Sequence, residues 1–255
     1  MNILNSVVIQ GLKSNGALSQ EEEVLLLELE HTPRRMAAGE VLWQENAEVD
    51  LFCVLKAGWA YSFRYLGNGT MQILSVYLPG DILGLRDFGF SRRMTGVAMV
   101  NEGLVSCFSH QHLFRLIRTS PALAAGLIAI VVRKQAMLTE RLVYVGRHTA
   151  QQRLAHFLYE IYLRLRSIGA VEEGSFQLPL SQEQVGDVLG LSAVHVSRTF
   201  SLLREEGLVL KDRQDVHFPD PEALAQMAEF NASYLDEPVP AVFNTLSQTH
   251  MMAAS

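Results

Sequence analysis

The stretch Leu180–Phe218 constrains the fold of this chain most, because it predicts two short helices separated by a tight turn. Ser181 and Gln184 have the spacing of a capping box, which begins the first helix. Gly190 ends that helix, since glycine readily adopts the positive φ angle wanted there. A second serine cap begins the next helix, predicted over Ser192–Glu206. Both helices have an apolar inner face, consisting of Val185, Val188, Leu189, Val196, Phe200 and Leu203.

Two short helices joined by a turn of three or four residues that contains Gly are typical of a helix-turn-helix. Two apolar runs follow, Leu208–Leu210 and Val216–Phe218, and predict a wing around Lys211–Asp215. In such a motif the second helix enters the major groove of DNA, where its N-terminal residues meet base edges. The residues that we expect to contact DNA are Ser181, Gln182, Ser192, Val194, His195, Ser197 and Arg198.

Arg198 is the best candidate for base recognition in this set, because a guanidinium can form two hydrogen bonds to guanine. Val194 can touch a thymine methyl group, and the hydroxyl and imidazole groups can bind phosphates or bases. The plainer interpretation is a helical hairpin that only packs, with Arg198 as a solvated surface charge. The two caps, the turn glycine, the inner spacing and the wing together favour DNA binding.

The segment 120–148 predicts one long helix with two apolar faces. Ser120 and Pro121 form a typical helix start. One stripe has the alternating spacing of four and three that defines a heptad seam, and its members are Ala124, Ile128, Val131, Gln135, Leu138, Leu142 and Val145. A second stripe points elsewhere and consists of Leu127, Ile130 and Met137. We expect the second stripe to cover the chain's own N-terminal domain and the seam to pair with a second copy. The alternative is a single buried core helix.

Residues 34–109 carry short apolar runs broken by glycines, a pattern that predicts an antiparallel β-roll or barrel. The runs are Glu40–Trp43, Leu51–Lys56, Trp59–Tyr65, Gln72–Leu78, Val97–Val100 and Leu104–Phe108. Short helices are predicted on either side, over Gln20–Glu30 and Gln111–Thr119. In the C-terminal part we expect a helix over residues 150–168, a loop Gly169–Gly174 and a helix Ala223–Phe230 on the wing.

The predicted fold class is therefore α+β, in four parts. Residues 1–119 form an N-terminal helix and the β-roll, and residues 120–148 form the dimerisation helix. Residues 149–230 form the winged helix-turn-helix domain, and residues 231–255 form an acidic C-terminal tail.

The net charge of −6 weighs against nucleic-acid binding, but the distribution of charge does not. Residues 133–166 hold seven Lys or Arg against two Glu, whereas the acids gather towards the two ends of the chain. Phosphate contact depends on the local field, so this distribution permits DNA binding. No apolar run reaches the ~18 residues of a membrane span. No basic segment followed by an apolar one marks a signal peptide, so we expect a cytoplasmic protein without membrane partners.

The chain has two cysteines, Cys53 and Cys107, which lie far apart and outside any recognised motif. We expect both to be buried structural thiols within strands, with neither a disulfide framework nor a metal cluster. His110 and His112 lie at a strand-to-helix junction, and no spacing marks either as a metal or haem ligand. Because the sequence also lacks a phosphate-cradling Gly loop with Lys and a nucleophile elbow, we do not expect an enzyme.

The order of these parts resembles the Crp/Fnr family of bacterial transcription regulators over roughly Thr32–Phe218. The motifs that carry the resemblance are Ala38-Gly39-Glu40, the run Leu55–Gly58, the segment Leu78–Gly84, the helix start Ser120-Pro121 and the block Leu180–Val209. The resemblance implies a homodimer paired along the long helices and an N-terminal roll of the cyclic-nucleotide-binding type. It also implies a pseudo-palindromic double-stranded DNA site and RNA polymerase as a partner.

The chain departs from the members that bind cyclic AMP at the positions that hold the nucleotide. Leu85 stands where those members have a Glu for the ribose, Met94-Thr95 where an Arg-Ser pair holds the phosphate, and Leu138 where a polar residue reads adenine. A buried ligand group left unpaired costs ~1–3 kcal/mol, so cyclic AMP is not the expected effector. The pocket that the resemblance implies consists of Leu85, Arg86, Arg92, Arg93, Thr95, Leu138 and Thr139. Its arginines either clamp an anion or lie in a solvated loop.

Members that bind an iron–sulfur cluster carry an N-terminal cysteine cluster that this sequence lacks, so no cluster is expected and the identity of effector or cofactor stays open. Ala193 and Val194 stand where many members have Arg and Glu, which predicts a different operator, while Arg198 is retained. We therefore predict a homodimeric DNA-binding regulator that either responds through the β-roll to a signal other than cyclic AMP or is constitutively active without an effector. The alternative is a cyclic-nucleotide-binding regulatory module whose C-terminal helices contact protein.

Overall fold

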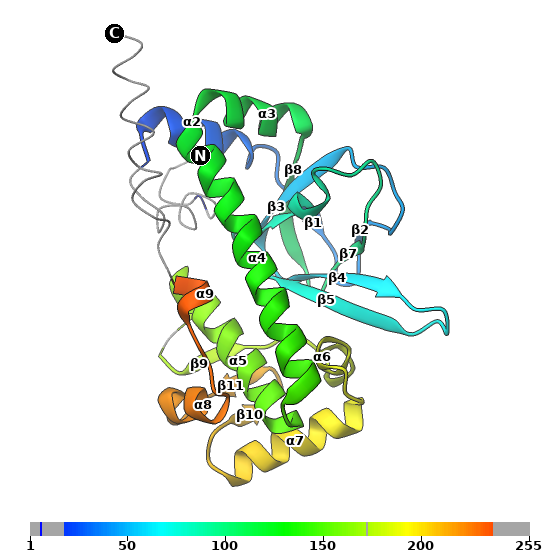
Figure 1. Cartoon of the computed structure of the whole chain (residues 1–255), viewed down its shortest axis with the longest axis vertical. Coiled ribbons are helices and arrows are strands. Elements are labelled where there is room, and N and C mark those ends of the chain that lie inside the picture. The colour runs from blue at the N-terminus through cyan, green and yellow to red at the C-terminus, as the bar shows by residue number, and fades with distance from the viewer. Residues whose placement is uncertain (1–5, 7–17, 172, 237–255) are drawn as a thin grey trace.

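The computed structural model describes residue 6, residues 18–171 and residues 173–236. Figure 1 shows a β-roll beside the upper part of one long helix, α4 (Pro121–Arg147), and a C-terminal domain around the lower end of that helix. The predicted acidic tail is described only as far as Asp236, and its remainder lies outside the described residues.

Two antiparallel four-stranded sheets form the β-roll, in the strand orders β1-β8-β3-β6 and β2-β7-β4-β5. The strands are β1 (Arg34–Met36), β2 (Val41–Trp43), β3 (Leu51–Ala57), β4 (Ala60–Tyr65), β5 (Met71–Tyr77), β6 (Ile82–Leu83), β7 (Gly96–Met99) and β8 (Gly103–Ser109). Inner side chains of both sheets share one core, which includes Leu55, Tyr77, Val97 and Met99. The outer side of β3 packs with the two short helices α2 (Gln20–Glu28) and α3 (His110–Thr119). The predicted roll is thus confirmed.

The prediction for the two cysteines is wrong. Cys53 in β3 and Cys107 in β8 are direct partners in the strand ladder, and their sulfurs form a disulfide across a sequence separation of 54 residues. Cys53 is buried as expected, but Cys107 is exposed. Strand register brings the two residues together, and register between distant strands cannot be read from cysteine spacing.

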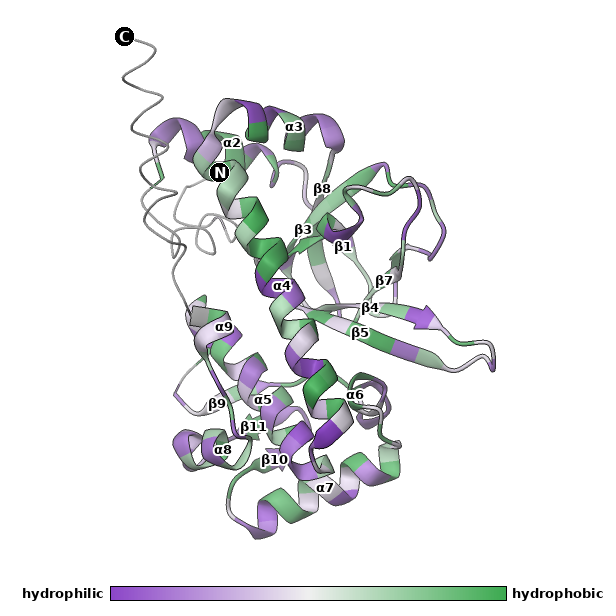
Figure 2. Cartoon of the chain, in the orientation of Figure 1, coloured by the Kyte–Doolittle hydropathy of each residue, from purple (hydrophilic) through white to green (hydrophobic). Residues whose placement is uncertain are grey.

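Helix α4 begins where predicted, because the Ser120 hydroxyl accepts a hydrogen bond from the Leu123 amide at 3.1 Å. Leu127 and Met137 of the second stripe are buried, and Leu127 belongs to the core shared with α2, α3 and β3. The heptad seam instead lies mainly on the outer side, and Figure 2 shows hydrophobic segments in green along this helix. Among the described residues, α4 is the helix long and apolar enough to span a membrane. Its two apolar faces, one packed and one open, explain this composition.

The C-terminal domain is built on α5 (Ala150–Ser167), α6 (Gln182–Leu189) and α7 (Ala193–Glu205). A three-stranded sheet in the order β10-β11-β9 follows the helices, formed by β10 (Leu210–Asp212), β11 (Asp215–His217) and β9 (Ser175–Gln177). The wing forms at the predicted place, but the predicted loop Lys211–Asp215 is too long, because Lys211, Asp212 and Asp215 lie in the strands. Strand β9 was not predicted. The last two helices are α8 (Pro221–Met227), which contacts α5, and α9 (Ser233–Asp236), which contacts α4.

Candidate nucleic-acid interface and sensor pocket

The helix-turn-helix forms through the local contacts that the sequence predicts. The Ser181 hydroxyl accepts a hydrogen bond from the Gln184 amide at 3.1 Å, and the Gln184 side chain accepts one from the Ser181 amide at 2.9 Å. Gly190 has φ 67° and ψ 39°, the left-handed conformation that ends α6. The Ser192 hydroxyl then caps α7 by accepting from the His195 amide at 3.2 Å. All six predicted inner residues of the two helices are buried.

The predicted DNA contacts lie at the N-terminal ends of α6 and α7. Ser181, the N-cap of α6, and Gln182, the first residue of α6, are exposed, while Ser197 on α7 is half-buried. One shallow hollow is lined by Ser192, Val194, His195 and Arg198, all of which are exposed. The structure therefore brings four of the seven predicted residues to one surface. Their contact with bases and phosphates stays a prediction.

Three residues at the start of α5 line the same hollow and were not predicted: Thr149, Ala150 and Gln151. Thr149 and Gln152 form a capping box, with the Thr149 amide donating to the Gln152 side chain at 3.1 Å. This Thr-x-x-Gln spacing was available in the sequence as a helix start. It gave no sign that the α5 N-terminus would lie beside α7, because that neighbourhood depends on tertiary packing.

A pocket of ≈ 290 Å³ lies between the β-roll and α4. Its wall comes from β5, β6, the short helix η2 (Leu85–Asp87) and its flanking loop, and α4. Three of the predicted effector residues line it, namely Leu85, Arg86 and Leu138. Lys134 and Gln135 of α4 line it as well and were not predicted.

The other predicted effector residues lie away from this wall. Arg93 is buried, with its guanidinium 4.0 Å from the centre of the Trp43 ring and 3.6 Å from an Asp87 carboxylate oxygen. It is thus an internal ion-pair residue and not part of a solvated loop. The Arg92 side chain donates to a loop carbonyl, and Thr95 is buried. The Thr139 hydroxyl donates along α4 to the carbonyl four residues before it.

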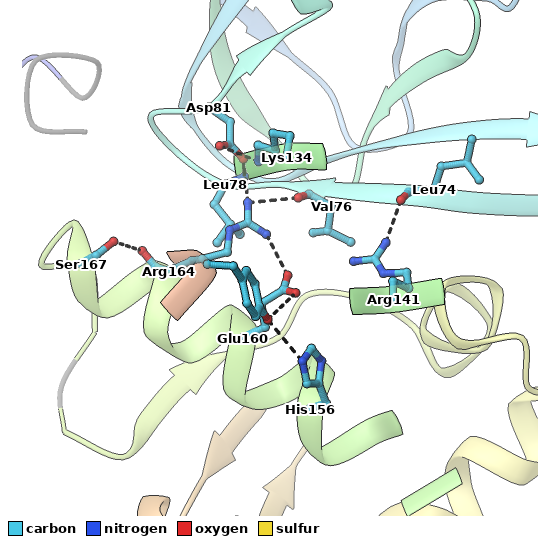
Figure 3. Close-up of polar contacts among 11 residues, drawn as sticks. Leu74, Val76, Leu78, Asp81, Lys134, Arg141, His156, Glu160, Arg164 and Ser167 are labelled. Carbon is cyan, nitrogen blue, oxygen red and sulfur yellow. Dashed lines mark hydrogen bonds and ion pairs between the residues drawn. The ribbon is translucent and has the colours of Figure 1, made fainter. Parts of the chain in front are cut away.

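A polar network joins the β-roll, α4 and α5 (Figure 3). One Asp81 carboxylate oxygen lies 2.8 Å from Lys134 Nζ, and the other lies 2.7 Å from Arg164 Nη2. Arg164 also donates to the carbonyl oxygen of Val76 in β5 at 3.2 Å. Burial alone would raise the pKa of Asp81, but the two cations outweigh it and the pKa is lowered. Burial, assisted by Arg164, lowers the pKa of Lys134 to about 8.

Apolar packing reinforces this junction. Trp59, Ile73 and Leu78 of the β-roll belong to the same core cluster as the inner residues of α5, α6 and α7. The Gln72 side chain donates to a backbone carbonyl of α6, and Arg141 of α4 donates to the carbonyl oxygen of Leu74 at 2.7 Å. The helix-turn-helix is therefore held directly against the strand β5, in addition to its covalent link through α4.

Residues 228–236, which we call the C-terminal strap, pack across the junction of α4 and α5. The Tyr234 hydroxyl lies 3.2 Å from His156 Nε2 and 3.4 Å from a Glu160 carboxylate oxygen. The Tyr144 hydroxyl donates to the carbonyl oxygen of Ala228 at 2.9 Å, and its ring lies 3.7 Å from that of His156. Burial first, then Arg141 and a further histidine, lower the pKa of His156 to about 3.

Two family models match the chain in the order of its domains. A model of the cyclic nucleotide-binding domain matches residues 33–120, which are the β-roll and α3. A model of the Crp-like helix-turn-helix domain matches residues 152–227. The two models leave α4 between them, at the place where the predicted dimerisation helix stands.

Relatives share both domains. The chain is 27% identical over 222 residues to the nitrogen fixation regulation protein FixK of Bradyrhizobium diazoefficiens, covering 85% of this chain and 91% of that protein. It is 24% identical over 212 residues to the transcriptional activator protein Anr of Pseudomonas protegens, covering 83% and 86%. The solved structure of FixK2 from Bradyrhizobium japonicum matches with a TM-score of 0.71 at 24% identity, covering 79% of this chain and 98% of that one. The chain belongs to the Crp/Fnr family of transcription regulators.

Proposed function

We propose that this regulator is a homodimer whose two subunits pair along the heptad seam of α4, and that this pairing delivers two copies of α7 to DNA. The open seam is the observation that carries the proposal: Ile128 is 64% exposed and Leu142 is 76% exposed in the single chain. Apolar surface left in water costs ~25 cal/mol per Å², so a contiguous stripe of this kind favours association. The polar Gln135 within the seam would set the register of the pair.

In the proposed complex, each α7 enters one of two successive major grooves ~34 Å apart on a pseudo-palindromic site. Arg198 forms two hydrogen bonds to a guanine, and Val194 touches a thymine methyl group. The Ser192 hydroxyl accepts from the backbone of α7, which leaves its own proton free to donate to a phosphate. In this proposal the protein acts in the cytoplasm and contacts RNA polymerase at a promoter.

The signal in this proposal is a small anion with an apolar part, bound in the pocket between the roll and α4. Arg86 and Lys134 provide positive charge in the wall, and Leu85 and Leu138 provide apolar surface that is unsuited to the polar groups of cyclic AMP. An anion drawn to Lys134 would compete with its ion pair to Asp81, and Asp81 also holds Arg164 of α5. A ligand with different affinity for the two arrangements would thereby re-aim the DNA domain.

Selection of duplexes from random oligonucleotides tests the function, with sedimentation of the free protein beside it. We expect a dimer and a pseudo-palindromic preferred site. Arg198→Ala should lower the affinity for the preferred site by roughly 5- to 150-fold per half-site contact, from ~1–3 kcal/mol per base contact, without changing sedimentation. Arg204→Ala is the matched control, because Arg204 is an exposed arginine in the last turn of the same helix. A monomer with no preferred duplex would end the proposal.

The match of residues 33–120 to the cyclic nucleotide-binding model supports a second candidate, a regulatory module that binds a cyclic nucleotide and acts through protein contacts. Calorimetric titration with cyclic AMP and cyclic GMP separates the two candidates. Measurable binding heat together with the lack of any preferred duplex would favour the second. The wing formed by β10 and β11 weighs for the first.

A further inference from the structure

The pair Cys53–Cys107 lies in a strand ladder that holds the two residues side by side whether or not the sulfurs are bonded. Their Cα atoms are 4.0 Å apart. Ladder partners continue on both sides, with Phe52 opposite Phe108 and Val54 opposite Ser106. Because these neighbours fix the register, closing or opening the bridge does not change which residues of the two strands are paired. Each thiol is therefore present at high effective concentration beside the other.

The two cysteines differ in their exposure to solvent. Cys53 is 2% exposed and packs in the core between the sheets with Leu55 and Leu83, whereas Cys107 is exposed. A small reagent in solution can therefore reach Cys107 first. An accessible cysteine beside a protected partner is the arrangement in which the first reacts and the second resolves the product.

Disulfides are rare in the cytoplasm, because thiol reductants keep cysteines there reduced, and those that do form are mostly transient. In the cytoplasmic setting proposed above, a bridge that includes the exposed residue Cys107 would exchange with the thiol pool. Two cysteines already opposite each other in a ladder would then report the oxidation state of that pool.

We propose that Cys53 and Cys107 form a reversible thiol–disulfide exchange site for low-molecular-weight disulfides of the glutathione class. The Cys107 thiolate attacks one sulfur of the reagent, which forms a mixed disulfide and releases a first small thiolate. The Cys53 thiolate then attacks the Cys107 sulfur, which closes the protein bridge and releases a second small thiolate. The protein loses two protons and two electrons, and the reagent gains both. A small thiol in excess reverses each step.

The bridge is one strand away from the pocket between the roll and α4. Cys53 is paired on its other side with Leu83 of β6, and Val54 is paired with Ile82. Ile82, together with Gly84 and Leu85 just after β6, lines that pocket. Closing the bridge links β3 covalently to β8. This link restricts the motion of β3, the strand with which β6 is paired. The redox state of the pair therefore alters the affinity for DNA, a consequence that rests on the proposed function.

The chemistry is tested on the full-length protein equilibrated with reduced and oxidised glutathione over a series of ratios, then alkylated and weighed by mass spectrometry. We expect the wild type to pass from two alkylated cysteines to none, with no lasting mixed disulfide. Cys53→Ala should retain one glutathione on Cys107. Cys107→Ala should not react while circular dichroism shows it to be folded, and Cys107→Ser gives a second variant for the same test.

Two results would overturn the proposal that these cysteines form an exchange site. One is a wild type that keeps both cysteines alkylatable at every ratio. The other is a folded Cys107→Ala or Cys107→Ser protein that gains glutathione as fast as Cys53→Ala, since the order of reaction follows from burial.

The coupling is tested with the oxidised and reduced wild type on the selected duplex, with the double variant Cys53→Ala/Cys107→Ala as control. We expect affinities that differ by ~5- to 150-fold in the wild type, the usual range of coupling between sites, and no difference in the control. Equal wild-type affinities would overturn the coupling. A protein with no preferred duplex would overturn the proposed function, and the mass measurement would still decide the exchange site.

Discussion

Glycine is required at position 186 in α6 because the main chain of the following turn lies very close to it. Its own backbone conformation is not unusual. A Cβ atom built there would lie 2.4 Å from the carbonyl oxygen of Leu191. The Leu191 amide also donates to the Gly186 carbonyl oxygen at 3.0 Å, so the turn after α6 folds back directly onto the helix. At this position a side chain would have to displace main chain, which is much stiffer than another side chain.

Gly186→Ala should therefore lower the free energy of unfolding by ~1–3 kcal/mol, the usual cost of forcing extra atoms into a packed region. Gly146→Ala in α4 is the matched control, because a Cβ atom there meets nothing within 4 Å. The control should gain ~0.5–1 kcal/mol from the higher helix propensity of alanine. Chemical denaturation followed by circular dichroism measures both. Equal effects of the two substitutions would contradict the argument.

Residues whose role is local could be predicted, and residues whose role depends on a distant partner could not. Gly190, Ser181 and Ser192 act within their own turn, so the spacing of residues in the sequence was sufficient. Gly186 depends on a turn that folds back over it, and Arg93 depends on Trp43, which is far away along the chain. The bridge between the two cysteines likewise depends on the register of β3 and β8.

Among the secondary-structure elements, the longer helices and the short strands next to recognisable turns were predicted, as the three-residue strands β2, β10 and β11 show. Helices α4, α6 and α7 are long enough for an apolar stripe to recur, and each has a serine cap. Strands β1, β6 and β9 have only two or three residues, over which an alternating pattern cannot be distinguished from chance. The C-terminal strap also escaped prediction, because its aromatic residues find their partners on α4 and α5.

The strap makes the stability of the junction dependent on pH. His156 has a pKa of about 3 when folded and about 6.5 when unfolded, because it is buried beside cationic neighbours. Its neutral form is thus favoured by folding, and the associated stability is fully present above about pH 6.5. That stability is lost as the pH falls from there towards 3, by about 2–3 kcal/mol at roughly pH 4.5.

His156→Gln removes the titrating group and keeps a polar side chain near Tyr234. We expect the variant to lose less stability than the wild type between about pH 7 and pH 4.5, by about 2–3 kcal/mol. Guanidinium unfolding at the two pH values measures the difference. His217→Gln serves as the control, because His217 is an exposed histidine in β11, and it should follow the wild type. Identical losses in His156→Gln and the wild type would show that His156 is not buried as described.

At the scale of the whole molecule, the β-roll and the helix-turn-helix domain are joined twice. One link is covalent, through α4 into α5, and the other is the junction of Asp81, Lys134 and Arg164 with the apolar core around β5 (Figure 3). The order of domains followed from sequence patterns and the family resemblance. The junction did not, since its ion pairs join residues that are far apart in sequence and gain their strength from burial.

A substitution in the heptad seam of α4 tests the proposed dimer. In the single chain the Leu142 side chain is mostly in water, so Leu142→Glu should leave the fold of each subunit intact. In a dimer paired along the seam, the same change would bury two carboxylates close together. We expect the dimer dissociation constant to rise by at least roughly 100-fold, equivalent to ~3 kcal/mol, with a parallel loss of affinity for the preferred duplex.

Val24→Glu is the matched control for this substitution, because Val24 is an exposed apolar residue on α2 and is not a member of the seam. It introduces the same charge into the same protein and should leave both sedimentation and DNA affinity unchanged. If Leu142→Glu forms dimers with the same dissociation constant as the wild type, the subunits do not pair along the heptad seam. Because each recognition helix depends on that meeting for its spacing, the model of two grooves read by one dimer would then have to be replaced.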